Sequence, residues 1–191
     1  STVLAVSFSG ELAYEIHVPN ASLYAAYLGL REAGKAHGMQ LFGARAVNAM
    51  RIEKGFLHWK ADLLTEFDPF ETGLDRFVKL EKGDFVGRDA LIRRQAKGSS
   101  KRLVTLEIAT TDAPAHDGAS VMVDDKVVGT ITSGEWGHRV GKNLAYAFVD
   151  LDVAEPDVML EVDMCGLLVS AKVIQASPYD SSHQLMRGLK R

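Results

Sequence analysis

The chain has 191 residues, 47% of them hydrophobic, and a formal net charge of −3 at pH 7. This length and composition allow a hydrophobic core without stapling by disulfides or metals, in one large or two small domains. The small negative charge and the lack of a long basic run argue against nucleic acid as the main partner. No apolar stretch approaches the roughly 20 residues that span a bilayer, so no membrane partner is expected.

The opening stretch predicts two β-strands joined by a tight turn. Residues 3–8 are mostly apolar and predict a strand covered on both faces. Residues 14–18 alternate, which predicts a half-buried strand with Glu15 on the face away from the core. Gly10 permits a close turn, and Glu11 brings a second carboxylate near that face. Two carboxylates suit a ligand rich in N–H donors, whereas a lone strand glutamate is as often merely solvated.

Two helices are expected next. In residues 20–38, Leu23, Tyr27 and Leu30 recur at helical spacing. A second helix spans about residues 44–53 and is closed by Gly55. Arg45 lies in its first turn, where the helix dipole disfavours a cation. A residue placed against a local preference indicates a function, and the alternative is a surface ion pair.

Residues 56–80 predict a loop, a helical turn after Pro69 and a short strand at 76–80. Trp59 follows a histidine in this loop. A tryptophan here is either a core or interface residue, or a wall for a flat heterocycle. Residues 86–96 predict an amphipathic helix with a solvated basic face. The single cysteine, Cys165, is expected to be a small buried side chain and favours a reducing compartment.

The segment GSSKR at residues 98–102 is the best linker candidate. After it, short apolar runs separated by turn residues, with no helix between them, predict a small β-barrel or sandwich. The predicted fold class is therefore α+β, with domains at residues 1–98 and 102–191. The tight spot at residues 132–134 is either a plain bulge or a contact with the neighbouring domain. Strands are expected at 103–108, 120–123, 126–132, 143–149, 158–162 and 167–174.

Several chemistries find no support in the sequence. It has no glycine-rich phosphate loop, no Gly-x-Ser-x-Gly elbow, and no cysteine and histidine spacing for zinc. What remains from the residues themselves is a cleft with carboxylates, an arginine and an aromatic wall. That combination suits a binding domain for a polar heterocycle.

Five blocks carry a family resemblance. SFSGELAYEIHVP, GARAVNAMRIEKG, HWKADLLTEFDPFETGL, VKLEKGDFVGRDAL and VGTITSG occur in this order over nearly the whole chain. They resemble the aminomethyltransferase family, the T-protein of glycine cleavage and its relatives. The His-Trp pair and the Thr-Glu-Phe-Asp-Pro-Phe-Glu run are more similar to the folate-binding region of dimethylglycine and sarcosine dehydrogenases. The resemblance implies the second half of a T-protein-like folate-binding domain followed by a C-terminal β-barrel.

The resemblance also implies a tetrahydrofolate site. In this family the glutamate at the position of Glu15 holds the amino-pyrimidine edge of the pterin, and an arginine that falls on Arg45 lines the site. A carboxylate accepts two parallel N–H bonds from such a ring, so the chemistry agrees. Phe8 takes a position where relatives often have tyrosine, and Ala13 replaces a usual glycine. The implied folate-binding residues are Glu15, Arg45, Phe8, Tyr14, Glu11 and Trp59.

By this resemblance the chain is a C-terminal fragment of a longer parent protein, and no catalytic residue is assigned to it. The parent is expected to be an enzyme that transfers a one-carbon unit from a small methylated amine to tetrahydrofolate. In the dehydrogenase branch an FAD domain lies upstream, although nothing in this chain forms a dinucleotide fingerprint. The alternatives are a glycine cleavage aminomethyltransferase and a folate-binding or regulatory relative without transfer activity. The expected location is the cytoplasm, or the mitochondrial matrix in a eukaryote.

Overall fold

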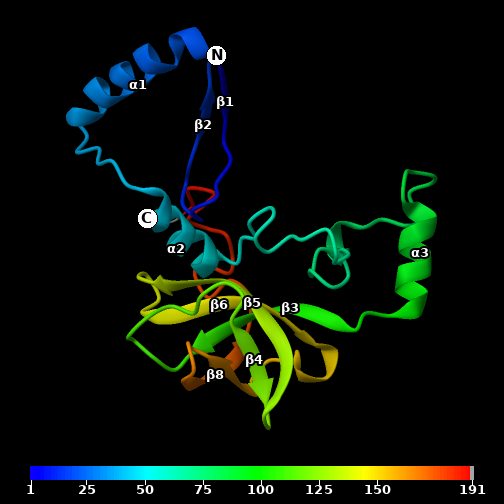
Figure 1. Ribbon diagram of the computed structural model, residues 1–191. Helices are drawn as coiled ribbons and strands as arrows, with labels where there is room; N and C mark the ends of the chain where they lie inside the picture. The colour runs from blue at the N-terminus through cyan, green and yellow to red at the C-terminus, as the bar shows by residue number, and fades with distance from the viewer. Residues whose placement is uncertain (190–191) are drawn as a thin grey trace.

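The computed structural model describes residues 1–189, and it shows an α+β chain whose C-terminal part is a closed barrel (Figure 1). All neighbouring barrel strands are antiparallel, in the order β3-β6-β5-β4-β7-β8, and β8 pairs back onto β3 to close the ring. The predicted barrel is confirmed, with strand limits close to those expected. The strands are β3 (Lys101–Ile108), β4 (Ser120–Val123), β5 (Lys126–Gly137), β6 (Lys142–Asp150), β7 (Met159–Asp163) and β8 (Leu168–Ile174).

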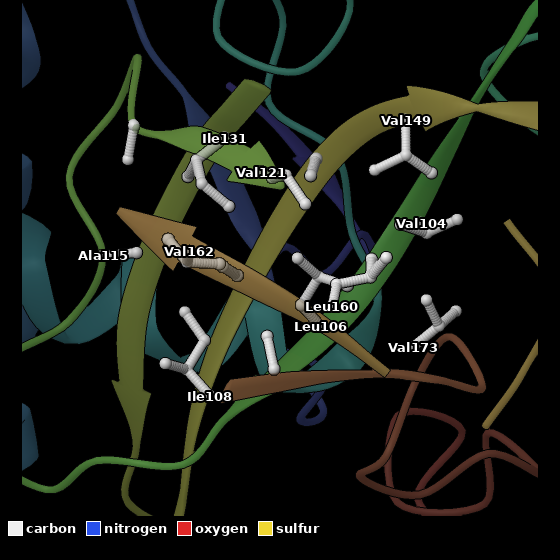
Figure 2. Packing of buried hydrophobic residues seen from close by; sticks show 14 residues of the cluster. Val104, Leu106, Ile108, Ala115, Val121, Ile131, Val149, Leu160, Val162 and Val173 are labelled. Carbon is white, nitrogen blue, oxygen red and sulfur yellow. The ribbon is translucent and has the colours of Figure 1, made fainter. Parts of the chain in front are cut away.

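The barrel interior is filled by fourteen buried aliphatic side chains (Figure 2). Along β3 every second residue points inward, namely Val104, Leu106 and Ile108. This alternation is the period-2 pattern of a strand with one face in a core. The barrel therefore carries its own hydrophobic core, and its outer surface is free to bind other segments.

Strand β5 is irregular where the sequence contains the tight spot at residues 132–134. Its register with β6 shifts between Ile131 and Ser133, as in a β-bulge. Gly134 is needed there because a Cβ atom would lie 2.2 Å from the carbonyl oxygen of Ala115. The bulge also brings Thr132 and Ser133 against Asp62 of the N-terminal part. Both interpretations of this spot are therefore correct.

The N-terminal part begins with an arm that stands off the barrel (Figure 1). Strands β1 (Thr2–Leu4) and β2 (Glu15–His17) pair antiparallel, and helix α1 (Asn20–Lys35) follows. In Figure 1 the helix diverges from the strand pair and does not pack along it. No residue of α1 is buried.

Three predictions for the arm are wrong. Residues 3–8 are not covered on both faces, and residues 14–18 do not form a half-buried strand, because β1 and β2 are exposed throughout. The connection between the strands is also longer than a tight turn. The reason is that no layer within residues 1–189 packs on the strand pair. Its apolar side chains, among them Val3, Leu4 and Ile16, consequently face solvent.

Helix α2 (Ala44–Lys54) joins the arm to the barrel and packs against β5 and β6. It ends as predicted, at Gly55, whose φ of +79° is a left-handed cap that glycine adopts without strain. Helix α3 (Arg88–Lys97) is also confirmed.

Three further features complete the fold. The strand expected at residues 76–80 is wrong: Asp75–Phe77 is a 3-10 helix, and no described strand lies alongside to pair with the segment. A second 3-10 helix spans Leu151–Val153. Cys165 is exposed, not buried, because it occupies the β7–β8 turn with φ of +59°. Within residues 1–189, no helix combines the length and the apolar character needed to cross a membrane.

Candidate functional site

The implied folate residues lie on the arm, on the first turn of α2 and on the loop after it. Glu15 begins β2, and its Oε2 lies 3.2 Å from Nε2 of His17, two residues along the same strand face. The Glu15 side chain is 60% exposed, so its carboxylate is open to a ligand. Tyr14, its neighbour, is also exposed.

Phe8 lies at the base of the arm, next to residues that follow α2. Its ring stacks on Phe56 with a centroid distance of 6.5 Å and an interplanar angle of 9°, and it lies 6.2 Å from the ring of His58. These contacts make an aromatic group that remains partly exposed. Trp59 is 64% exposed and forms an isolated bridge with Leu63. An exposed indole is available as a wall for a flat ring, whereas the core alternative is wrong.

Arg45 is almost fully exposed on the first turn of α2. Its Nε lies 3.8 Å from Oε1 of Glu135 on β5, and Glu135 also accepts a hydrogen bond of 3.2 Å from Nδ2 of Asn48. The Arg45 side chain is 89% exposed whereas that of Glu135 is 14% exposed. The arginine is therefore loosely held by the barrel and retains free N–H donors.

Glu11 has a structural partner that the sequence did not indicate. Its Oε1 accepts hydrogen bonds of 2.5 Å from Nη1 of Arg139 and 2.7 Å from the hydroxyl of Tyr179. The hydrogen bond to Glu11 raises the pKa of Tyr179, and burial acts in the same direction. The Arg139 guanidinium also lies 3.8 Å from the centroid of the Tyr179 ring. Glu11 therefore ties the base of the arm to the β5–β6 turn and to the C-terminal segment.

Arg139 also binds the β5–β6 turn to helix α2. Its Nε donates to Oε2 of Glu53 at 2.5 Å and its Nη2 to the carbonyl of Met50 at 2.6 Å. The other carboxylate oxygen of Glu53 accepts the backbone N–H groups of Arg139, at 2.6 Å, and Val140, at 3.1 Å. Burial lowers the pKa of Arg139, but the hydrogen bonds that it donates to Glu53 and Glu11 outweigh burial and raise the pKa overall.

A second buried network joins α2, the following loop and β5. Arg51 donates through Nη1 to Asp62 and, at 2.8 Å, through Nη2 to the hydroxyl of Ser133. Asp62 also accepts the hydroxyls of Ser133 at 2.6 Å and Thr132 at 2.7 Å, and the backbone N–H of His58 at 2.8 Å. Asp62 is 0% exposed. Because every charge and lone pair has a partner, this network fixes how the loop lies on the barrel.

The last turn of α2 completes the junction. The ammonium of Lys54 binds the backbone carbonyl and, at 3.0 Å, the carboxylate of Asp180. Burial raises the pKa of Asp180, but the hydrogen bond from Lys54 outweighs it and the net pKa is lowered. Gly10 packs on the Lys54 stem, where a Cβ would lie 2.7 Å from Lys54 Cγ. This close packing of Gly10 on Lys54 is a role that the sequence, which indicated only a close turn there, did not predict. Tyr146 donates to the carbonyl of Ile52 at 3.0 Å, and burial raises its pKa.

This arrangement is suited to binding. The exposed carboxylate of Glu15 and the rings of Phe8 and Trp59 are carried by the arm and by the loop after α2. Buried ion pairs fix the base of the arm, α2 and this loop to the barrel, and these fixed segments form a platform for a ligand. No group of three or more histidine, cysteine, aspartate or glutamate residues able to hold a metal occurs in the described part of the chain.

Sequence reasoning missed the residues that build the platform: Arg51, Glu53, Lys54, Asp62 and Arg139. A signal existed for the first three, because the run Arg-Ile-Glu-Lys surrounds the fully buried Ile52 in the last turn of α2. Because Ile52 is buried against the barrel, the charged residues next to it in the helix also lie close to the barrel.

Two family patterns match the chain. Residues 1–82 match the GCVT N-terminal domain, and residues 101–180 match the glycine cleavage T-protein C-terminal barrel domain. Among solved structures, the glycine cleavage system aminomethyltransferase T from Bartonella henselae has the same fold. Its TM-score is 0.85 at 21% identity, over 94% of this chain and 50% of that one.

Curated relatives fall into two groups. Mitochondrial dimethylglycine dehydrogenase of Rattus norvegicus is 37% identical over 175 residues, which is 91% of this chain and 20% of the relative. Mitochondrial sarcosine dehydrogenase of Mus musculus is 32% identical over 97% of this chain and 21% of its own length. Aminomethyltransferase of Caldanaerobacter subterraneus subsp. tengcongensis is 29% identical over 95% of this chain and 48% of its own.

The chain thus spans about a fifth of the dehydrogenases and about half of the aminomethyltransferases. Both family patterns, in their N-terminal to C-terminal order, together cover most of the sequence. The chain belongs to the aminomethyltransferase family, the family of the glycine cleavage T-protein.

Proposed function

We propose that this chain is the C-terminal part of a tetrahydrofolate-dependent one-carbon transfer protein of the dimethylglycine and sarcosine dehydrogenase type. The observation that carries the proposal is the 37% identity to a dimethylglycine dehydrogenase over 91% of this chain. The parent protein would oxidise a small methylated amine and pass the released carbon to tetrahydrofolate. The FAD for that oxidation would be bound by a part of the parent outside this chain.

Within the chain, the proposed tetrahydrofolate contacts are Glu15, Arg45, Phe8, Tyr14 and Trp59. The exposed carboxylate of Glu15 suits the N–H edge of the pterin, because an ionised carboxylate accepts two parallel hydrogen bonds. The rings near the base of the arm supply flat apolar surface. Glu11, the sixth residue of the predicted site, is proposed to support the arm, since its carboxylate already binds Arg139 and Tyr179.

The exposed arm supports the proposal that a further part of the parent completes this domain. Helix α1 and strands β1 and β2 expose many large apolar side chains and bury none of their residues. Apolar surface of this extent is normally covered by a neighbouring layer. The half of the folate domain that this chain lacks is the proposed cover, with domain limits at residues 1–98 and 102–191. The chain alone is then expected to bind folate weakly, because the cleft is open on one side.

Replacement of Glu15 by glutamine in the parent protein tests the site. The amide keeps the size of the side chain but points a donor at the N–H groups of the pterin. Folate affinity is expected to fall by about tenfold to a few hundredfold, which corresponds to roughly 1.5–3 kcal/mol. Calorimetric titration with tetrahydrofolate measures it. Glu32→Gln on α1 is the matched control, since Glu32 is exposed and, among residues 1–189, forms an ion pair only with Lys35. Equal affinities of wild type and Glu15→Gln, with the fold intact, would remove Glu15 from the site.

A second candidate is an aminomethyltransferase of the glycine cleavage type, favoured by the 29% identity to an aminomethyltransferase over 95% of this chain. An assay for oxidation of dimethylglycine or sarcosine by the parent protein separates the two candidate functions, because only a dehydrogenase is expected to oxidise these amines. A third possibility, a folate-binding relative without transfer, would bind tetrahydrofolate and show neither activity. The names of the dehydrogenase relatives favour a mitochondrial location in a eukaryotic source. For any other source, the cytoplasm is the proposed location.

A further inference from the structure

A cleft of about 830 Å³ lies beside the end of α2, and one of its lining residues, Phe56, stacks on Phe8. Its walls come mainly from the end of α2, the 3-10 segment around Arg76, the beginning of β3, the 3-10 helix Leu151–Val153 with the residues after it, and the end of β8 with the C-terminal segment that follows. None of Glu15, Arg45, Phe8, Tyr14, Glu11 and Trp59 lines it. The volume is in the range of sites for small organic molecules.

One part of the cleft is apolar. Phe56 and Leu57 follow α2, Leu103 comes from β3, and Val173 and Ile174 come from β8. Leu57, Leu103 and Ile174 are half-buried and pack with Ile52 and Tyr146 in a small hydrophobic cluster. A ligand body of hydrocarbon or aryl type would find contact surface here without displacing a buried residue.

The polar part of the cleft is cationic. Arg76 and Arg102 both line it, and neither forms an ion pair or side-chain hydrogen bond with any residue from 1 to 189. The guanidinium of Arg76 lies 4.8 Å from the ring centroid of Phe77, which holds it at the wall. Lys54 is already neutralised by Asp180, and Glu155 is the one carboxylate among the lining residues. The cleft thus holds two uncompensated guanidinium groups, which prefer a carboxylate or similar planar anion.

A third polar group lacks a partner. Nδ1 of His183 is buried without a hydrogen bond to any described residue, and His183 lines the cleft. His183 adopts a left-handed conformation, φ +58°, and its backbone N–H donates to the carbonyl oxygen of Asp180 at 2.9 Å. A buried ring nitrogen is normally paired, so a bound molecule that reaches it would satisfy a group that the chain leaves open.

We propose that this cleft binds a small organic carboxylate with an apolar body. Arg76 and Arg102 take the carboxylate, and the Phe56, Leu57 and Leu103 surface takes the body. The site goes beyond the proposed folate function and does not depend on it, because none of the five proposed tetrahydrofolate contacts lines the cleft. Phe56, which stacks on Phe8, borders both sites.

The test uses 4-phenylbutyrate as the carboxylate probe and 4-phenylbutanol as its uncharged counterpart. Each is titrated into the chain with methyl NMR signals of leucine, isoleucine and valine as the readout. The carboxylate is expected to shift the methyl signals of Leu57, Leu103 and Ile174, and to bind at least about twofold more tightly than the alcohol. Arg76→Gln and Arg102→Gln should each weaken the carboxylate about two- to fivefold and leave the alcohol unchanged.

Arg93→Gln is the matched control, because Arg93 is exposed on α3 and does not line the cleft. It should leave both affinities unchanged. The proposal is overturned if the shifts fall outside the cleft, if acid and alcohol bind equally, or if Arg93→Gln weakens the acid as much as the other two variants. A parallel titration with tetrahydrofolate separates the two sites: competition with 4-phenylbutyrate would assign the cleft to folate and also overturn the proposal. Failure of Glu15→Gln to affect folate would leave this site untouched.

Discussion

Replacement of Asp62 by asparagine tests whether the buried ion pair fixes the loop after α2 onto the barrel. Asparagine has nearly the same shape as aspartate. With its amide oxygen toward Arg51 and the His58 N–H, its NH₂ group faces the hydroxyls of Thr132 and Ser133, which rotate to accept. The number of hydrogen bonds at this position is thereby kept, although the two hydroxyls no longer donate to it, and the main change is the loss of the negative charge.

The cost comes from Arg51, whose side chain is 2% exposed and would keep its positive charge with no counterion. Removal of one partner of a buried ion pair costs about 3–5 kcal/mol, and the retained hydrogen bonds place the expected loss at the lower end, ~3 kcal/mol. For a domain of this size that loss lowers Tm by about 6–12 °C. Urea unfolding followed by circular dichroism and tryptophan fluorescence measures the change in the free energy of unfolding.

Glu107→Gln is the matched control because Glu107 forms an ion pair of 2.6 Å with Lys142 on the barrel surface, where both side chains are partly exposed. Its expected effect is below about 1 kcal/mol. Adding Arg51→Met to Asp62→Asn removes the orphan charge, so the double variant should lose less than the sum of the single variants. A loss below about 1 kcal/mol for Asp62→Asn, or strict additivity of the pair, would refute the reasoning.

Two further predictions concern pH and packing. Burial raises the pKa of Asp68, but hydrogen bonds from Arg94 and from two backbone N–H groups outweigh burial and lower the pKa overall. Asp68 therefore stabilises the fold at pH values above its unfolded pKa of about 3.9. This stabilisation is lost as the pH falls through the lower pKa of the folded state. The Tm of Asp68→Asn should therefore lie below wild type at about pH 7 and approach it towards about pH 2, and a constant gap would contradict this. Gly134→Ala should lose roughly 1–3 kcal/mol in urea unfolding, because its Cβ would lie 2.2 Å from a backbone oxygen. Gly29→Ala, with open space in α1, should not lose stability, and an equal loss at both positions would show that the contact is irrelevant.

The barrel was predictable because its information is local. Each strand alternates or runs apolar over a few residues and ends at turn residues, so β4 was predicted at its observed limits and the others within a few residues at most ends. The extension of β5 from Thr132 to Gly137 was missed, because a serine, a glycine and a glutamate interrupt the apolar pattern there. The end of α2 at Gly55 was predictable for the same local reason.

The arm shows the opposite case. Its sequence correctly indicated strands and a helix, but burial was inferred from apolar content alone. Apolar residues are buried only where another layer covers them, and residues 1–189 contain no such layer for β1, β2 and α1. The residues that the family resemblance placed in the folate site are indeed accessible, and their role stays a prediction.

The sequence by itself determined the family, the barrel and the order of the elements, since these follow from motifs and periodicity within short windows. Only the tertiary structure decided which charges are buried and paired. Asp62 meets Ser133 seventy-one positions away, and Arg139 meets Glu11 across 128 positions. No local pattern specifies such partners, because burying a charge is favourable only when the complementary groups arrive together from distant parts of the chain.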